Sequence, residues 1–241
     1  MTTTEPVLGV LGGMGPAATA DFMARLARLT PADRDQDHIP TIVYSDPTTP
    51  DRSDAILGNG PSPLPALVRG IEFLNRAGCA LIAIPCNTAH YWYADLAGRS
   101  RAPILHIVDA TADRLRSRGG VGTVGVLATD GTIRAGIYQE RLGAAGMGTV
   151  DLTDQGDRNP VMRGIRAVKA GREAEARDLL HAAATELVRR GADVLVVGCT
   201  DVSVALAGSA SVAGVAVVDA SDCLALAAVD KLGRRPVAGC G

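Results

Sequence analysis

Short apolar runs rich in β-branched residues alternate along the chain with longer stretches of helical periodicity. The pattern predicts strands at residues 7–11, 42–44, 81–84 and 104–108. Helices are predicted at residues 16–29, with a proline in the first turn, at residues 67–77, and from about residue 88. Residues 47–65 are rich in proline and glycine and are predicted to form a long loop. This alternation predicts an α/β fold with mainly parallel sheets.

The second half of the chain repeats the first in three places. Residues 7–11 resemble 123–127, residues 78–88 resemble 191–200, and residues 107–110 resemble 217–220, at offsets of 116, 113 and 110 residues. Because the three matches occur in the same order and at nearly the same offset, they predict two similar doubly wound lobes related by pseudo-two-fold duplication. The active site is predicted to lie in a cleft between the two lobes. The predicted lobes are residues 1–113 plus 219–241 and residues 114–218, the final helix returning to the first lobe.

Composition narrows the class of protein. The 241 residues carry 24 basic and 26 acidic side chains, which argues against a nucleic-acid-binding surface. No apolar run approaches the roughly 18 residues of a membrane-spanning helix. The first residues do not resemble a signal peptide, and the five cysteines are an odd number. We therefore expect reduced thiols and a cytoplasmic location, with no nucleic-acid or membrane partner.

Two cysteines occupy the same place in both copies of the repeat. Cys86 and Cys199 each follow a buried strand at the start of a helix, at the edge where open α/β sheets bind ligands. A helix N-terminus also favours the reactive thiolate. Two facing thiols suit racemisation, because one removes a proton from a carbon and the other returns one to the opposite face. Cys79 and Cys223 lie in apolar stretches and are predicted to be core residues, and Cys240 lies in the C-terminal tail.

Polar residues follow both cysteines. Asn87, Thr88 and Thr200 are candidates to hold a carboxylate group of a substrate together with nearby backbone N–H groups. Ordinary N-capping of a helix explains the same residues, and both roles use the same geometry. His90 lies one helical turn after Cys86, where it either tunes the thiolate or occupies an ordinary helix face.

Four motifs in order along the chain resemble the aspartate/glutamate racemase family, on its aspartate racemase branch. They are Gly12-Gly13-Met14-Gly15-Pro16, Pro50-Asp51-Arg52, Pro85-Cys86-Asn87-Thr88-Ala89-His90 and Gly198-Cys199-Thr200-Asp201. Residues 161–165 and 168–171 also look like that branch. The resemblance extends from about residue 7 to residue 231 and therefore covers nearly the whole chain.

This resemblance implies an amino-acid racemase that uses no cofactor and no metal, has aspartate as its expected substrate, and forms a homodimer. Cys86 and Cys199 match the catalytic thiols, with Cys86 serving the D-enantiomer and Cys199 the L-enantiomer. Arg52 matches the arginine that pairs with the substrate's side-chain carboxylate, and Lys169 matches a second cation in that role. The complete set of implied substrate-binding residues is Met14, Arg52, Asn87, Thr88, Thr129, Thr132, Lys169 and Thr200.

The chain departs from the family pattern at three places. Ser45 and Asp46 stand before Pro47 where we expect two asparagines, and Asp201 stands where we expect glutamate. An expected glutamine is missing around residues 157–159. Asp46 would place a negative charge beside a dicarboxylate substrate, so these departures bear on the choice of substrate more than on the proton-transfer chemistry.

Several alternatives remain at this point. Within the enzyme class they are a racemase of glutamate or of another amino acid, a maleate isomerase, a hydantoin racemase and an arylmalonate decarboxylase. The decarboxylase keeps one cysteine, and Arg52 and Lys169 favour an acidic substrate over a hydantoin. Residues 13–18 loosely fit a dinucleotide-binding loop, and Cys86 with His90 loosely fits a zinc site. The non-enzyme alternative is a two-lobed small-molecule binding protein.

Overall fold

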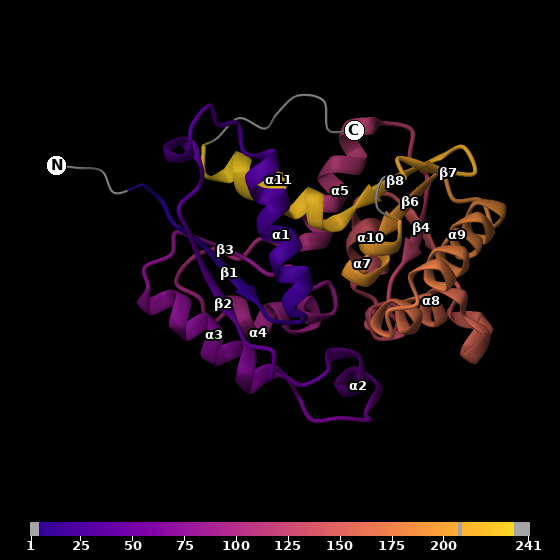
Figure 1. Cartoon of the computed structure of the whole chain (residues 1–241), viewed down its shortest axis with the longest axis horizontal. Coiled ribbons are helices and arrows are strands. Elements are labelled where there is room, and N and C mark those ends of the chain that lie inside the picture. Colours follow the sequence, from indigo (N-terminus) through magenta and orange to yellow (C-terminus); the bar gives the residue numbers. More distant parts are fainter. Residues whose placement is uncertain (1–4, 207–208, 234–241) are drawn as a thin grey trace. The chain divides into compact units, whose positions relative to one another are not determined.

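The computed structural model describes residues 5–206 and 209–233 (Figure 1). Its strands are β1 (Leu8–Gly12), β2 (Thr41–Ser45), β3 (Leu81–Ala83), β4 (Thr123–Leu127), β5 (Gly148–Val150), β6 (Val194–Val197), β7 (Ser211–Val212) and β8 (Val215–Asp219). Its α-helices are α1 (Pro16–Leu29), α2 (Arg52–Leu57), α3 (Leu64–Arg76), α4 (Tyr93–Ala97), α5 (Ile107–Arg118), α6 (Asp130–Arg134), α7 (Ile137–Ala144), α8 (Pro160–Lys169), α9 (Glu173–Arg189), α10 (Thr200–Ala205) and α11 (Ala220–Lys231). Three 3-10 helices are η1 (Asp35–Asp37), η2 (Thr88–Trp92) and η3 (Thr153–Arg158).

The chain divides into two compact units. The first comprises Met1–Ala110 with Ser221–Gly241, and the second comprises Thr111–Ala220. Helix α5 therefore begins in the first unit and continues in the second, whereas α11 begins at the last residue of the second unit and continues in the first. That each unit folds as a domain of its own stays a prediction.

The first unit is built on a parallel sheet in the order β2-β1-β3. The central strand β1 is buried at every position, as expected for a strand with neighbours on both sides. Helix α3 packs against β1 and β2, because Leu67, Ile71 and Leu74 recur at helical spacing and form one buried face. The apolar core of this unit also includes Cys86, whose side chain is buried.

The second unit contains a five-stranded sheet in the order β5-β4-β6-β8-β7. The first four strands are parallel, and only the short edge strand β7 runs antiparallel to β8. Helix α9 packs against β4, β6 and α8. The close approach of α8 to α9 depends on Gly164, because a Cβ atom there would lie 2.6 Å from Cγ of Leu180. These sheets confirm the predicted α/β class.

Strand pairing supports the predicted duplication in the register of the two sheets. In the first unit Leu8 pairs with Leu81. Their equivalents in the second unit are Val124, 116 positions after Leu8, and Val194, 113 positions after Leu81, and these two residues also pair. The third match, at residues 107–110 and 217–220, is wrong by three residues. In the first unit Ile104 bridges Ile82, and in the second unit Val217 pairs with Leu195. Each residue of the second pair lies 113 positions after its equivalent in the first pair, so the true offset is 113 and not 110.

Three local predictions are also wrong. The strand predicted at residues 104–108 reduces to a single bridge at Ile104, because helix α5 begins at Ile107. Its first two N–H groups are capped by imidazole nitrogens, Ile107 by His90 and Val108 by His106. The predicted loop at residues 47–65 contains helix α2, which Asp51 caps by accepting a hydrogen bond from the Asp54 amide. The helix predicted from residue 88 is the 3-10 helix η2, followed by α4.

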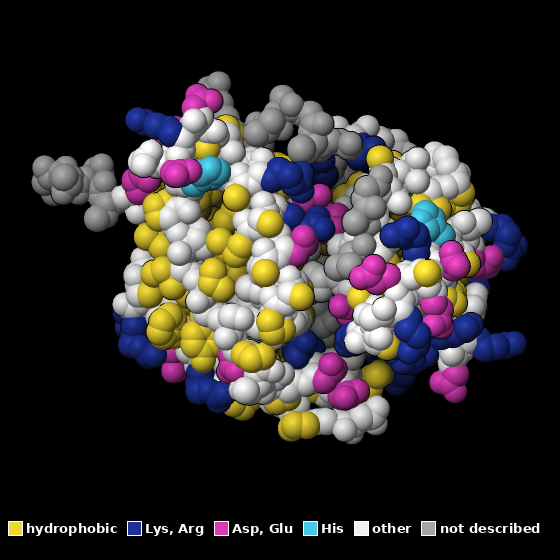
Figure 2. All heavy atoms as spheres, in the orientation of Figure 1, with side chains coloured by type: hydrophobic (Ala, Val, Ile, Leu, Met, Phe, Trp, Pro, Cys, Tyr) yellow, Lys and Arg dark blue, Asp and Glu magenta, His cyan; other side chains and the backbone are white. Residues whose placement is uncertain are grey.

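The surface agrees with the balanced composition. Basic and acidic side chains are interspersed on the face of the molecule that Figure 2 shows. Within the described ranges, every helix is either too short or too polar to span a lipid bilayer.

Candidate active site

Cys86 lies in a buried turn that follows β3 in the first unit. Its side chain is 8% exposed, and its amide donates a hydrogen bond to the carbonyl of Ile84 at 2.8 Å. Asn87 and Thr88 follow it and are also buried, at the start of η2. The element behind Cys86 is therefore a 3-10 turn, and the predicted support from an α-helix N-terminus is wrong for this thiol.

His90 contacts the Cys86 turn through the backbone. The imidazole is 3% exposed, and its Nδ1 lies 2.9 Å from the carbonyl oxygen of Cys86. The Ile107 amide donates to Nε2 at 3.2 Å. Nε2 also lies 3.4 Å from the carbonyl oxygen of Leu105. The shorter contact, from the Ile107 amide, requires an Nε2 without a proton; the proton of a neutral ring then lies on Nδ1 and is donated to the Cys86 carbonyl. The ring also packs against Tyr93 and edge-on against His106.

Arg52 is the first residue of α2, and this helix packs against η2. Its guanidinium donates three hydrogen bonds to carbonyl oxygens: Nη1 to Thr49 and Pro50, and Nη2 to Met14. Its Nε is buried and, among the residues that the structure describes, has no hydrogen-bond partner. The described residues give this cation no carboxylate within ion-pair distance. The arrangement leaves a positive charge for an anionic ligand.

The loop after β1 is held against the loop after β2. Gly13 has φ +92°, and a Cβ atom on it would lie 2.3 Å from the Asp46 amide nitrogen. The Gly13 amide donates to the Thr19 hydroxyl at 2.9 Å, which removes a donor that a dinucleotide phosphate would require. Met14 is buried beside this turn and contributes its carbonyl to Arg52.

The ionised carboxylate of Asp46 is stabilised by groups near it. It accepts hydrogen bonds from the Thr48 hydroxyl at 2.6 Å and from the Thr48 amide at 3.0 Å, and Arg69 lies 3.9 Å away. The hydrogen bond from the Thr48 side chain is the main reason that the pKa of Asp46 is lowered below its ordinary value. Because these partners favour the ionised form, the negative charge that the sequence predicts beside a dicarboxylate substrate is retained.

Cys199 occupies the corresponding position after β6 in the second unit. It is half-buried and directly precedes α10, which begins at Thr200. Its carbonyl accepts hydrogen bonds from the amides of Val202 and Ser203 at 3.0 and 3.2 Å. Cys199 therefore stands at the start of a short α-helix, as the sequence predicts, and it is more exposed than Cys86.

Lys169 is the last residue of α8, which packs against α10. The charge of Lys169 acts on Asp201, the second residue of α10. Burial raises the pKa of Asp201, and the attraction of Lys169 works against that rise. Asp201, which stands where the family pattern predicts glutamate, thus places its carboxylate in the electric field of Lys169, the lysine that the sequence assigns to substrate binding.

Thr129 and Thr132 hold the start of α6, after β4. Thr129 accepts a hydrogen bond from the Thr132 amide at 3.2 Å, and the two hydroxyl oxygens lie 3.0 Å apart. Thr129 therefore caps α6, and Thr132, whose amide it accepts, is fully buried.

Asn159 connects this loop to the next helix and is a residue that the sequence interpretation missed. It donates from Nδ2 to Asp130 at 3.0 Å and accepts from the Val161 amide at the start of α8. Burial raises the pKa of Asp130, and the hydrogen bond from Asn159 works against that rise. An asparagine directly before Pro160 was a visible capping signal.

The remaining cysteines fit the predicted structural roles where the structure describes them. Cys79 and Cys223 are buried thiols, and burial raises the pKa of Cys79. Cys79 fills the space above Gly9, because a Cβ atom at Gly9 would lie 3.0 Å from its sulfur. Cys240 lies outside the described residues.

The zinc alternative has little support from the geometry. Both ring nitrogens of His90 are within hydrogen-bond distance of backbone groups, so the ring does not present a nitrogen to a metal beside Cys86. Across residues 5–206 and 209–233, no group of three His, Cys, Asp or Glu side chains is arranged to hold a metal ion.

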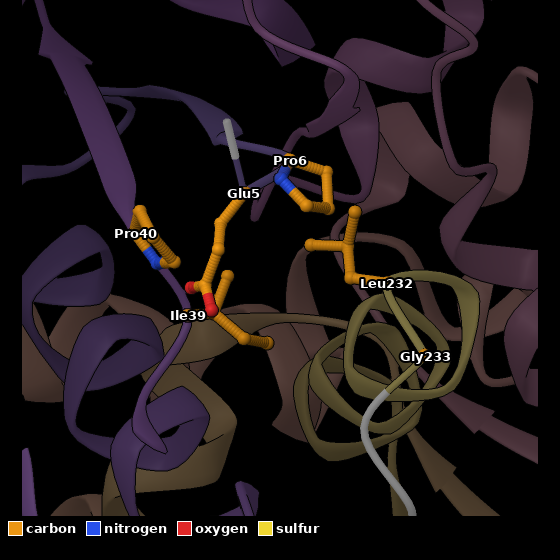
Figure 3. A pocket seen from close by; sticks show the side chains of 6 residues that line it. All are labelled: Glu5, Pro6, Ile39, Pro40, Leu232 and Gly233. Atoms are coloured by element: carbon orange, nitrogen blue, oxygen red, sulfur yellow. The ribbon is translucent and has the colours of Figure 1, made fainter. Parts of the chain in front are cut away.

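A pocket of about 190 Å³ lies elsewhere in the first unit (Figure 3). It is lined by Glu5, Pro6, Ile39, Pro40, Leu232 and Gly233. The lining residues precede β1 and β2 or follow α11, so the pocket lies at the amino ends of the parallel strands. Cys86 follows the carboxyl end of β3, at the opposite edge of the same sheet.

The sequence-predicted site residues form one group in each unit. Met14, Arg52, Cys86, Asn87 and Thr88 follow the carboxyl ends of β1, β2 and β3 in the first unit. The second unit holds the other five, which are Thr129, Thr132, Lys169, Cys199 and Thr200. Their assignment as site residues stays a prediction.

Comparison with known proteins identifies the family. The model of the Asp/Glu/Hydantoin racemase family matches residues 11–228. The structure of Picrophilus torridus aspartate racemase superposes with a TM-score of 0.85 at 33% identity, covering 96% of each chain. The broad specificity amino-acid racemase RacX of Bacillus subtilis is 29% identical over 227 residues, which is 92% of this chain and 96% of RacX.

Glutamate racemases are also similar, over less of the chain. That of Corynebacterium diphtheriae is 34% identical over 147 residues, 58% of this chain and 54% of the relative. The glutamate racemase of Francisella tularensis, in complex with D-glutamate, shares the fold at 15% identity, with a TM-score of 0.69 over 95% of this chain and 81% of its own. The chain belongs to the Asp/Glu/hydantoin racemase family.

Proposed function

We propose that this protein interconverts L- and D-aspartate without a cofactor, with Cys86 and Cys199 as the two proton-transfer groups. The observation that carries the proposal is the pair of thiols at equivalent places after β3 and β6, at an offset of 113 residues in a duplicated fold. Membership of a racemase family supports the reaction class, and the likeness to an aspartate racemase supports the substrate.

In the proposed reaction, one thiolate removes the α-proton and the other thiol supplies a proton to the opposite face. With D-aspartate, the Cys86 thiolate takes the proton, the Cα–H bond breaks, and the electron pair stays on the α-carbon and its carboxylate. Cys199 then gives its proton to the other face, so that L-aspartate leaves and Cys199 remains as thiolate. The reverse reaction begins at Cys199. The mechanism requires the two thiols to reach the α-carbon from opposite sides.

The carbanion must be stabilised without a cofactor. Two features supply that stabilisation: water is excluded, and hydrogen-bond donors are already positioned around the α-carboxylate, where negative charge develops as the proton leaves. We assign this task to Asn87, Thr88 and Thr200, which flank the two thiols. Binding of the side-chain carboxylate is assigned to Arg52, which lacks a carboxylate partner among the described residues and has spare N–H groups.

A racemase of broader specificity is the second candidate. The positive charge of Lys169 acts on Asp201. The negative charge of Asp201 therefore weakens the attraction of Lys169 for the acidic side chain of a substrate. RacX, a broad-specificity amino-acid racemase, is similar over most of the chain. A homodimer and a cytoplasmic location also remain proposals, based on the resemblance to the family.

Incubation with single L-amino acids, followed by chiral chromatography, tests both candidates. The reduced protein is assayed without added pyridoxal phosphate against L-aspartate, L-glutamate and L-alanine. D-aspartate formed well ahead of the other D-enantiomers supports the proposal. Comparable rates with all three amino acids favour the broad-specificity candidate, and the absence of any D-product from folded protein rejects both.

A further inference from the structure

His90 has a buried, two-sided contact that the proposed chemistry does not use. Its Nδ1 lies 2.9 Å from the Cys86 carbonyl oxygen, and its Nε2 lies 3.2 Å from the Ile107 amide nitrogen and 3.4 Å from the Leu105 carbonyl oxygen. With the Ile107 amide as the donor to Nε2, the Nδ1–H donates to the Cys86 carbonyl. The imidazole therefore bridges the turn that carries the thiol and the first residue of α5. Both bonds require the neutral ring protonated on Nδ1.

Packing restricts the ring further. His90 stacks on Tyr93 with the ring centroids 6.4 Å apart, and His106 meets it edge-on at 4.6 Å. Tyr93 is itself held by a hydrogen bond from its hydroxyl to the carbonyl of Ile104 at 3.2 Å. The imidazole is 3% exposed, so water does not compete for its hydrogen bonds.

The second copy of the repeat lacks this contact. Ser203 stands at the position equivalent to His90, at the offset of 113 residues that also relates Cys86 to Cys199. Its hydroxyl is buried and has no hydrogen-bond partner among the described residues. Among the described residues, Ser203 therefore makes no bridge like that of His90.

We propose that His90 is a positioning residue for Cys86: its Nδ1–H fixes the carbonyl of Cys86 and thereby the direction of the thiol. The proposal rests on the proposed function, since it assumes that Cys86 transfers a proton. His90 does not touch the reacting atoms in this role. It acts through one backbone hydrogen bond, and a small misplacement of a reacting group costs about 10²-fold in rate.

Two substitutions separate the two bonds. His90→Asn places an amide N–H where Nδ1 stands and keeps the bond to Cys86. His90→Gln places an amide oxygen where Nε2 stands and keeps the bond from Ile107. Both remove the ring packing, so both should lower the melting temperature by a similar amount. His181→Asn, on α9 in the other unit, is the matched control.

Racemisation kinetics of these variants test the proposal, after the wild-type protein has been shown to racemise aspartate. We expect His90→Asn to keep most of the wild-type kcat and His90→Gln to lose about 10²-fold in kcat with KM unchanged. Mass spectrometry should show that the alkylation rate of Cys86 by iodoacetamide changes only in His90→Gln, while that of Cys199 stays constant. Equal losses in the two variants would mean a merely structural histidine and would overturn the proposal.

A measurement on the wild-type protein applies if either variant unfolds. Nitrogen-15 NMR of the histidine side chains reports which ring nitrogen of His90 carries the proton. A neutral ring protonated on Nδ1 supports the proposal. Protonation on Nε2 contradicts it, because the bond to the Cys86 carbonyl would then lack its proton. An inactive wild-type enzyme refutes the proposed function instead, so the two failures are distinguishable.

Discussion

Replacement of Arg52 by lysine tests how the site selects an acidic substrate. The guanidinium has five N–H groups, of which two on Nη1 and one on Nη2 are donated to carbonyl oxygens. The Nε–H, which is buried in the structure, and the second Nη2–H remain, and we propose that they bind the substrate carboxylate as a bidentate pair. Lysine keeps the charge and presents no planar pair of donors.

The expected magnitude follows from this count. A hydrogen bond to a charged group contributes about 1.5–3 kcal/mol, and about 1.4 kcal/mol corresponds to a factor of ten. Loss of one such bond to the substrate in Arg52→Lys should therefore raise KM for aspartate by about 10- to 150-fold. Because this contact is made equally in the ground state and the transition state, kcat should change little.

Chiral chromatography of aspartate racemisation over a range of concentrations gives KM and kcat. The matched control is Arg76→Lys, which makes the same exchange at an exposed position in the last turn of α3. The circular dichroism spectrum of each variant shows whether it is folded. A folded Arg52→Lys enzyme with the KM of Arg76→Lys would refute the assignment of Arg52 to the substrate carboxylate.

Three further substitutions test the structural account. Gly13→Ala should lower the melting temperature well below that of Gly58→Ala, because both glycines have positive φ, at about 1–3 kcal/mol of strain, while only Gly13 would also collide with Asp46; equal melting temperatures would contradict this. Asn159→Ala should cost about 1–2 kcal/mol in urea unfolding through the lost cap of α8, and a loss near zero would argue against it. Asp201→Asn should stabilise the protein at pH 7, because burial raises the pKa of Asp201 above 3.8, and the gain should vanish as the pH falls through that pKa; a gain that does not depend on pH would count against buried charge as the cause.

The positions of the main buried strands were accessible from the sequence. Buried runs such as β1 and β6 are short, apolar and bounded by turn residues, so period and composition identify them. The repeat located Cys86 and Cys199 at equivalent places, because a duplicated fold keeps the ends of its strands in register.

Other features depend on contacts between residues distant in sequence. Ile107 and Val108 are β-branched and favour a strand, yet two histidine rings cap their amides and start helix α5. Helix α2 lies within a proline-rich segment, where composition indicated a loop. The partners of Asp46 and the role of His90 also follow from tertiary packing, which no local pattern records.

The most direct test of the two-thiol mechanism is proton NMR of each aspartate enantiomer in D₂O with Cys86→Ala and Cys199→Ala. Cys79→Ala, which removes a buried core thiol, serves as the control. The account predicts that neither active-site variant forms the opposite enantiomer, that Cys86→Ala exchanges no α-proton of D-aspartate, and that Cys199→Ala exchanges none of L-aspartate. Interconversion at the wild-type rate by either single variant would contradict the mechanism.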